Sequence, residues 1–220
     1  MSKSRPALDF DYIEVVNFAL TMGLELIPED IRQRYHVEER RHASAILNSD
    51  FKYELNDILD CLRQFKLLRS EIIVGGGGKS KIASRFDDFL FDRGWREKTT
   101  KIGKTVDGKT TELETHKVDF CKGRIAVEVE WNNKDPFFSR DLSTFRLLHE
   151  QDIISVGLFI TRMDELQRIF DALGDGIGAK YGPSTTHWSK LLPRISAGEG
   201  GACPLLLIGI TAKCYVDDVP

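Results

Sequence analysis

The 220-residue sequence lacks long apolar runs, paired cysteines and a strong excess of charge of either sign. Since no stretch approaches the ~20 apolar residues that span a bilayer, we expect no association with a membrane. The N-terminal residues MSKSRPALDFDY contain no apolar segment of the kind found in signal peptides, which favours a cytoplasmic protein. The cysteines are widely spaced without a CxxC pair, so a zinc finger and a disulfide scaffold are both disfavoured: Cys61, Cys121, Cys203 and Cys214.

The formal net charge of −3 excludes binding to nucleic acid by bulk positive charge. Any contact with DNA must therefore use local basic patches. Residues 79–104 hold eight basic and four acidic side chains, and residues 180–197 hold three basic side chains and no acid. Either segment could also be an ordinary solvated face.

Apolar residues make up 41% of the chain, and their spacing predicts an α/β fold. We expect a central mixed β-sheet flanked by helices on both sides, in a domain of residues 39–220 preceded by a helical extension of residues 1–38. The predicted helices cover 11–27, 28–35, 51–67, 81–93, 139–150 and 163–173, and the predicted strands cover 41–48, 112–120, 124–131, 153–161 and 204–210.

A predicted hairpin within residues 117–131, KVDFCKGRIAVEVEW, carries an unusual number of carboxylates. Alternation along its second strand places Glu128 and Glu130 on one face, and the turn at residues 122–123 brings Asp119 close to them. Three crowded carboxylates repel each other unless a cation binds between them, and oxygen ligands without His or Cys suit Mg²⁺. The alternative is a half-exposed strand whose Glu side chains face water.

Asp119 followed nine residues later by Glu128-Val129-Glu130 resembles the D–x(n)–(D/E)xK signature of the PD-(D/E)xK nucleases. The wider context, VDFCKGRIAVEVEWNNKDPFFSRDLSTFRLLHEQDIISVGLFIT together with ACPLLLIGI, resembles type II restriction endonucleases of the BglII/BstYI group, relatives of BamHI. The resemblance covers roughly residues 40–212. It implies a restriction-endonuclease-like core and a hydrolase of a restriction system.

This resemblance implies a homodimer that cuts both strands of duplex DNA at a short palindrome, uses Mg²⁺ and leaves 5′ overhangs. Asp119, Glu128 and the carbonyl of Val129 would bind the metal. Glu130 stands where most members of the superfamily have lysine, and it would orient or deprotonate the attacking water or help to hold a second metal. A further polar residue is expected from the preceding helix, but Ala83 and Ser84 stand at the matching positions.

Two segments are candidates for binding DNA. In the family, the region just before the last core strand contributes to reading bases, and the residues after the catalytic strand could contact the scissile backbone. Ser and Thr could instead cap helices. The candidate residues are Ser184, Thr185, Thr186, His187, Lys190 and Arg194 in the first segment, and Asn132, Asn133, Lys134, Ser139 and Arg140 in the second.

The segment GGGGKS, residues 75–80, resembles a phosphate-binding loop. The full motif requires glycine five residues before Gly78, where this chain has Ile73, so we expect no nucleotide cofactor. Two other functions on the same fold are alternatives: a non-catalytic DNA-binding protein, which would have lost the carboxylates, and a nuclease of repair or of a mobile element.

Overall fold

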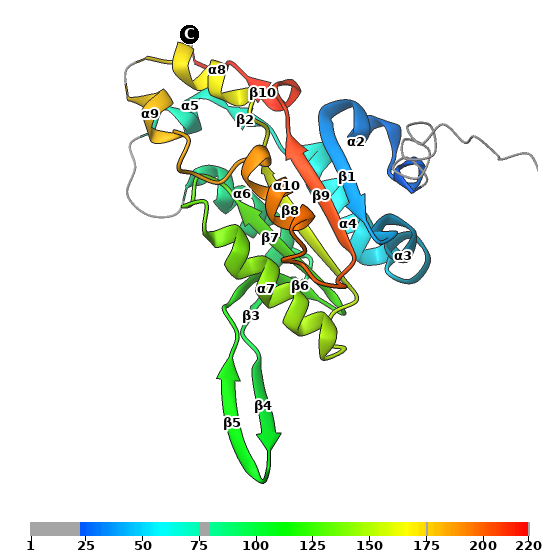
Figure 1. The fold of residues 1–220 in the computed structure, drawn as a ribbon. Coiled ribbons are helices and arrows are strands. Elements are labelled where there is room, and N and C mark those ends of the chain that lie inside the picture. The colour runs from blue at the N-terminus through cyan, green and yellow to red at the C-terminus, as the bar shows by residue number, and fades with distance from the viewer. Residues whose placement is uncertain (1–22, 75–79, 175, 220) are drawn as a thin grey trace, which may run out of the picture.

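A six-stranded mixed sheet forms the centre of the protein in a computed structural model that describes residues 23–74, 80–174 and 176–219 (Figure 1). Its strand order is β1-β9-β8-β7-β6-β3. The three central strands β7, β8 and β9 run parallel, whereas β1, β6 and β3 pair antiparallel with their neighbours. The strands are β1 (Tyr35–Arg40), β3 (Arg96–Lys98), β6 (Val118–Lys122), β7 (Ile125–Glu130), β8 (Val156–Arg162) and β9 (Leu205–Ile210).

Helices cover both faces of this sheet (Figure 1). Helices α7 (Phe137–Glu150) and α10 (Trp188–Ser196) pack on one face, and α3 (Ala43–Asp50), α4 (Lys52–Gln64) and α6 (Lys81–Asp92) pack on the other. The shorter elements are η1 (Leu24–Leu26), α2 (Glu29–Arg34), β2 (Leu67–Leu68), α5 (Arg69–Ile72), α8 (Leu166–Ala172), α9 (Ile177–Lys180), η2 (Ala212–Cys214) and β10 (Tyr215–Val216). Within the described ranges, every helix is too short or too polar to cross a bilayer.

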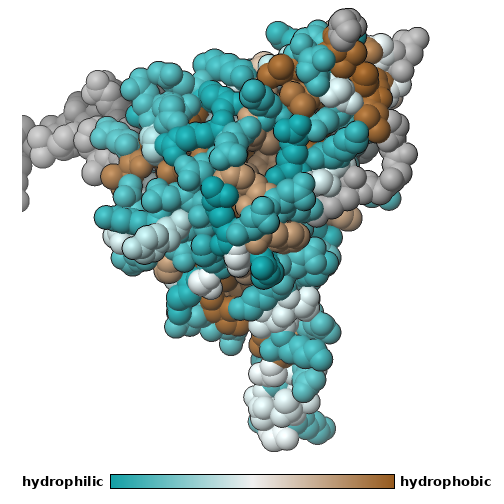
Figure 2. Space-filling view, turned by 180° about the vertical axis from the view of Figure 1, so that it is seen from behind, coloured by the Kyte–Doolittle hydropathy of each residue, from teal (hydrophilic) through white to brown (hydrophobic). Residues whose placement is uncertain are grey.

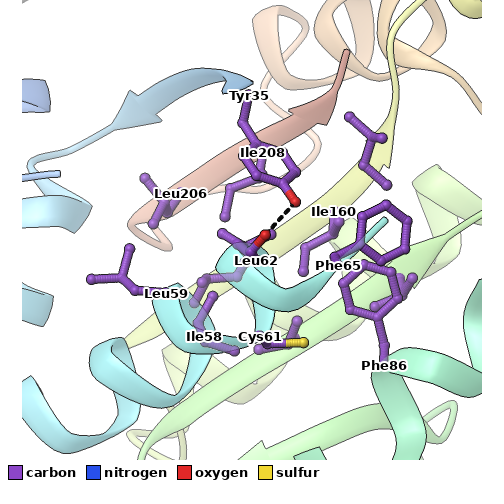
Figure 3. Packing of buried hydrophobic residues seen from close by; sticks show 14 of the residues in the cluster. Tyr35, Ile58, Leu59, Cys61, Leu62, Phe65, Phe86, Ile160, Leu206 and Ile208 are labelled. Atoms are coloured by element: carbon purple, nitrogen blue, oxygen red, sulfur yellow. Dashed lines mark hydrogen bonds between the residues drawn. The ribbon is translucent and has the colours of Figure 1, made fainter. Parts of the chain in front are cut away.

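The larger hydrophobic core lies between the sheet and α4 and α6 (Figure 3). Phe65 stacks on Phe86 of α6 with ring centroids 4.8 Å apart, and both side chains are buried. Three residues before Phe65, the backbone carbonyl of Leu62 accepts a hydrogen bond of 2.7 Å from the Tyr35 hydroxyl (Figure 3). This bond satisfies a buried polar group and fastens the edge strand β1 to α4.

A two-stranded hairpin projects from the body between β3 and β6 (Figures 1 and 2). It is formed by β4 (Lys101–Val106) and β5 (Lys109–Glu114), whose six residue pairs are almost wholly exposed. Its chain returns directly into β6, so it extends from the strand that carries Asp119.

The predicted α/β fold with a helix-flanked mixed sheet is confirmed. The predicted strand at 41–48 is wrong, because residues 43–50 form α3 and the edge strand lies earlier, at β1. The predicted strand 112–120 is two strands, β5 and β6. The predicted helix 11–27 lies largely outside the described residues, and the predicted boundary near residue 38 falls within β1, which pairs with β9.

Candidate active site

The hairpin of β6 and β7 positions the predicted carboxylates. Gly123 forms its turn with a φ of +54°, a conformation that glycine adopts without strain. Phe120 pairs with Val127 and Cys121 with Ala126, and this register leads to Asp119 opposite Glu128. Along β7 the residues Ile125, Val127 and Val129 face the α4–α6 side of the sheet, whereas Ala126 belongs to the core under α7. Glu128 and Glu130 share the parity of Ala126 and therefore face α7, as the alternation predicts.

A third buried carboxylate reaches this face from α7. Oxygen atoms of Glu128, Glu130 and Asp141 lie within 4.8 Å of one another, and all three residues are at most 1% exposed. Asp141 belongs to the inward face of its helix because it lies three residues after Phe138 and four before Phe145, both fully buried. We call these three residues the acidic cluster.

Asp119 stands beside the acidic cluster and is half-buried. Its Oδ2 accepts a hydrogen bond of 3.1 Å from the backbone N–H of Val129, and its own N–H lies 3.4 Å from Oε2 of Glu128. The two adjoining strands therefore hold Asp119 and Glu128 against each other through backbone groups.

Burial and, for the two glutamates, repulsion raise the pKa values of the carboxylates in the acidic cluster. Burial, with the charge of Asp141 next in importance, raises the pKa of Glu130 to about 9, and the same two causes raise the pKa of Glu128 well above its ordinary value. Burial also raises the pKa of Asp141. Among the described residues, Oε1 of Glu128 and Oδ2 of Asp141 are buried without a hydrogen-bond partner. Hard oxygen donors, buried and unpaired around one point, fit a divalent cation such as Mg²⁺.

Two polar side chains contact the acidic cluster from its rim. Asn133 donates a hydrogen bond of 3.0 Å from Nδ2 to Oε2 of Glu130. Arg140 donates one of 2.7 Å from Nε to Oδ1 of Asp141. These bonds fix Oε2 of Glu130 and Oδ1 of Asp141, whereas Oε1 of Glu128 and Oδ2 of Asp141 have no partner within the described part of the chain.

Residues 35–210 match a family model described as restriction endonuclease BglII/BglIII. The chain belongs to this family. The enzyme is therefore a type II restriction endonuclease, a site-specific deoxyribonuclease that binds DNA and hydrolyses phosphodiester bonds, as the sequence resemblance implies. No curated protein matches the chain.

The two candidate DNA-binding segments of this endonuclease lie side by side. The N–H of Thr186 donates 2.8 Å to the carbonyl of Asn133, the N–H of Asn133 donates 3.1 Å to Oγ1 of Thr186, and the N–H of Asp135 donates 3.1 Å to the carbonyl of Ser184. Because Asn133 also contacts Glu130, these segments adjoin the acidic cluster.

The candidate DNA-binding side chains differ in accessibility. Ser184 and Lys134 are exposed, and Thr186 and His187 are buried; Thr185, Lys190, Arg194, Asn132 and Asn133 are half-buried. Lys190 and Arg194 both lie within ion-pair distance of Asp135, at 3.7 and 3.8 Å. The most accessible side chains at the junction of the two segments are therefore Ser184 and Lys134.

Sequence analysis did not identify Asp141, the third carboxylate of the acidic cluster. The preceding helix α6 offers Ala83 and Ser84, whereas the carboxylate that joins the acidic cluster is Asp141 of the following helix. In the sequence analysis Asp141 lies only within the predicted helix 139–150. The signal that identifies it is its spacing from Phe138, Phe145 and Leu148, which puts it on the apolar stripe of α7.

The raised pKa of Glu130 predicts a pH-dependent cost to stability in the metal-free enzyme. The unfolded chain releases the proton of Glu130 near pH 4.5, whereas the folded protein keeps it up to about pH 9. The contribution of Glu130 to the free energy of unfolding is therefore fully present below pH 4.5 and is lost as the pH rises through about 9. We expect Glu130→Gln to raise the unfolding temperature in EDTA at pH 8 by on the order of 5–10 °C, and far less at pH 5.

Thermal unfolding followed by circular dichroism at both pH values measures this effect. Glu112→Gln on the exposed hairpin removes the same charge and serves as the control. An equal shift for Glu130→Gln at pH 5 and pH 8 would contradict the prediction.

Proposed function

We propose that this endonuclease acts as a homodimer that requires Mg²⁺, makes a double-strand break at a short palindromic DNA site and leaves 5′ overhangs. The observation that carries the proposal is the pair of buried oxygens without a partner among the described residues, Oε1 of Glu128 and Oδ2 of Asp141, within a cluster of three carboxylates. Burying such a cluster lowers the free energy of unfolding unless a bound cation offsets the repulsion between its carboxylates.

Asp119 and Glu128 would hold the metal, with the carbonyl of Val129 as a further oxygen. They come from two adjoining strands of the central sheet, so their positions are fixed by the backbone rather than by a loop. When bound, Mg²⁺ would polarise the scissile phosphate and neutralise negative charge that develops on it.

Glu130 would orient or deprotonate the attacking water or help to hold a second metal. Its Oε2 accepts a hydrogen bond from Asn133, and its Oε1 lies 3.8 Å from Nη2 of Arg140, so both oxygens have a polar neighbour. A pKa raised by burial makes Glu130 a stronger base once it has lost its proton, which suits proton abstraction.

The segments around Asn133 and Thr186 would place the DNA. Asn133 contacts the acidic cluster and, with Asn132 and Lys134, would contact the DNA backbone near the scissile bond. Ser184 would contact base edges or phosphates. Thr185, Lys190 and Arg194 follow as candidates for base edges or phosphates, and Thr186 and His187 would support them from their buried positions. Two-fold symmetry is the reason to propose a homodimer, since a palindrome offers the same chemistry to two identical subunits.

Digestion of a sequenced plasmid tests this function. With Mg²⁺ we expect discrete fragments, and sequencing of their ends gives the recognition site and the overhang in one experiment. With EDTA, or with Ca²⁺ in place of Mg²⁺, we expect no cleavage. A smear of products, nicks in one strand, or undiminished cleavage in EDTA would contradict the proposal.

A further inference from the structure

Arg140 projects over the acidic cluster and is held there by three groups. Its Nε donates 2.7 Å to Oδ1 of Asp141, and its Nη2 lies 3.8 Å from Oε1 of Glu130. The guanidinium carbon lies 4.1 Å from the ring centroid of Phe137, one turn earlier on α7. The charge is therefore positioned by a hydrogen bond, an ion pair and an aromatic ring.

Arg140 is more exposed to solvent than the carboxylates of the acidic cluster that it contacts. Its side chain is 32% exposed, compared with 2% for Glu130 and 0% for Asp141. A guanidinium has five N–H donors in a rigid plane, and a bond from Nε leaves donors available for a phosphate. A DNA strand that approaches the buried carboxylates from solvent thus meets a cation first.

None of the signature positions Asp119, Glu128 and Glu130 carries a positively charged side chain that could stabilise a phosphate. Glu130 stands where the commoner pattern has lysine, and the surrounding Asp119, Glu128 and Asp141 are acidic. Hydrolysis of a phosphodiester places additional negative charge on the phosphate oxygens, which a preorganised guanidinium stabilises by paired hydrogen bonds.

We propose that Arg140 is a catalytic residue whose guanidinium binds the non-bridging oxygens of the scissile phosphate, while Asp141 and Phe137 hold it in place. This inference rests on the proposed function. Arg140 forms no covalent bond: the water oxygen bonds to phosphorus as its proton passes to Glu130, the bond from phosphorus to the leaving strand's oxygen breaks, and that oxygen takes up a proton from solvent. Arg140 donates hydrogen bonds to the phosphate throughout.

The competing role is structural, in which Arg140 only holds Asp141 in position through the hydrogen bond from its Nε. Metal binding separates the two roles, because removing a cation from the acidic cluster should leave Mn²⁺ affinity equal or higher. We expect Mn²⁺ titrations of Arg140→Ala, followed by electron paramagnetic resonance, to show no loss of affinity. A loss of Mn²⁺ binding would support the structural role and overturn the proposal.

Single-turnover cleavage at saturating Mg²⁺ gives the main test. We expect Arg140→Ala to slow cleavage by about 10²–10³-fold and Arg140→Lys to be slowed less. Arg146→Ala is the matched control: it lies on the same helix, half-exposed, in an ion pair of 3.8 Å with Glu150. Arg146→Ala should cleave within about twofold of wild type, and equal rates for the two alanine variants would overturn the proposal.

A neutral methylphosphonate at the scissile position tests the contact itself. Binding is measured with Ca²⁺ on a duplex that carries the site found by plasmid digestion. The methylphosphonate should weaken binding by wild type and by Arg146→Ala, and weaken binding by Arg140→Ala much less. An equal loss for all three proteins would overturn the proposal. The proposed function fails separately, if wild type does not cleave DNA with Mg²⁺.

Discussion

Asp119→Ala and Glu128→Ala are each expected to abolish DNA cleavage while leaving specific DNA binding largely intact. Both side chains come from adjoining strands and would bind the metal, so either change weakens metal binding and removes the positive charge that would neutralise the phosphate. The loss of several kcal/mol of transition-state stabilisation corresponds to a factor of about 10³ or more in rate. Single-turnover cleavage with Mg²⁺, together with binding measured in Ca²⁺, separates the two effects.

We expect Glu128→Ala to fold, since Oε1 of Glu128 is buried without a hydrogen-bond partner among the described residues and removing the carboxylate relieves repulsion within the acidic cluster. Glu128→Gln keeps the side-chain volume and should be as inactive as Glu128→Ala. Asp50→Ala, an exposed acid on α3, is the control for loss of one negative charge. If Asp119→Ala and Glu128→Ala both cut DNA at the wild-type rate, the assignment of the active site is wrong.

The strand that carries the active site was predictable because its pattern has period two and is unbroken. IAVEVE alternates over six residues, and the only way to bury its apolar face leaves both Glu side chains on the other. The buried strands β8 and β9 were predictable for a similar reason, since each is a continuous apolar run between helices.

The edge of the sheet was harder to predict from the sequence. β1, YHVEER, is mostly polar because it is an edge strand with one partner, so its alternation is weak. Residues 41–48 contain enough apolar side chains to suggest a strand, yet Ala43 and Leu47 are four residues apart and buried together, which is helical spacing. The left-handed backbone at Arg41 and His42 marks the break between strand and helix.

The acidic cluster could be predicted only in part, because Asp141 is remote in sequence from the hairpin. Its position depends on where α7 begins. The helix starts at Phe137 and not at the predicted Ser139, so Asp141 lies inside the helix and faces the sheet. Contacts of this kind between a helix and a strand follow from packing, which a local sequence pattern does not contain.

Packing of α7 against the sheet predicts a double-mutant cycle at Phe145 and Gly157. Phe145 is fully buried on α7 and packs on Phe159 with ring centroids 5.0 Å apart. A Cβ added at Gly157 of β8 would lie 2.3 Å from Cδ2 of Phe145, so the helix approaches the sheet at a position where a methyl group does not fit. We expect Phe145→Ala to cost about 3–5 kcal/mol of unfolding free energy through its cavity, and Gly157→Ala to cost about 1–3 kcal/mol through the clash.

The double variant should be less destabilised than the sum of the two single variants, because the added methyl group enters the space that Phe145 leaves. Urea unfolding measures all four proteins, with Gly103→Ala as the control, since its nearest neighbour would be 3.8 Å away. Additive effects would mean that the two residues do not share this space. Because α7 carries Asp141, the cleavage rates of folded variants should follow the same order, which would connect helix packing to the geometry of the acidic cluster.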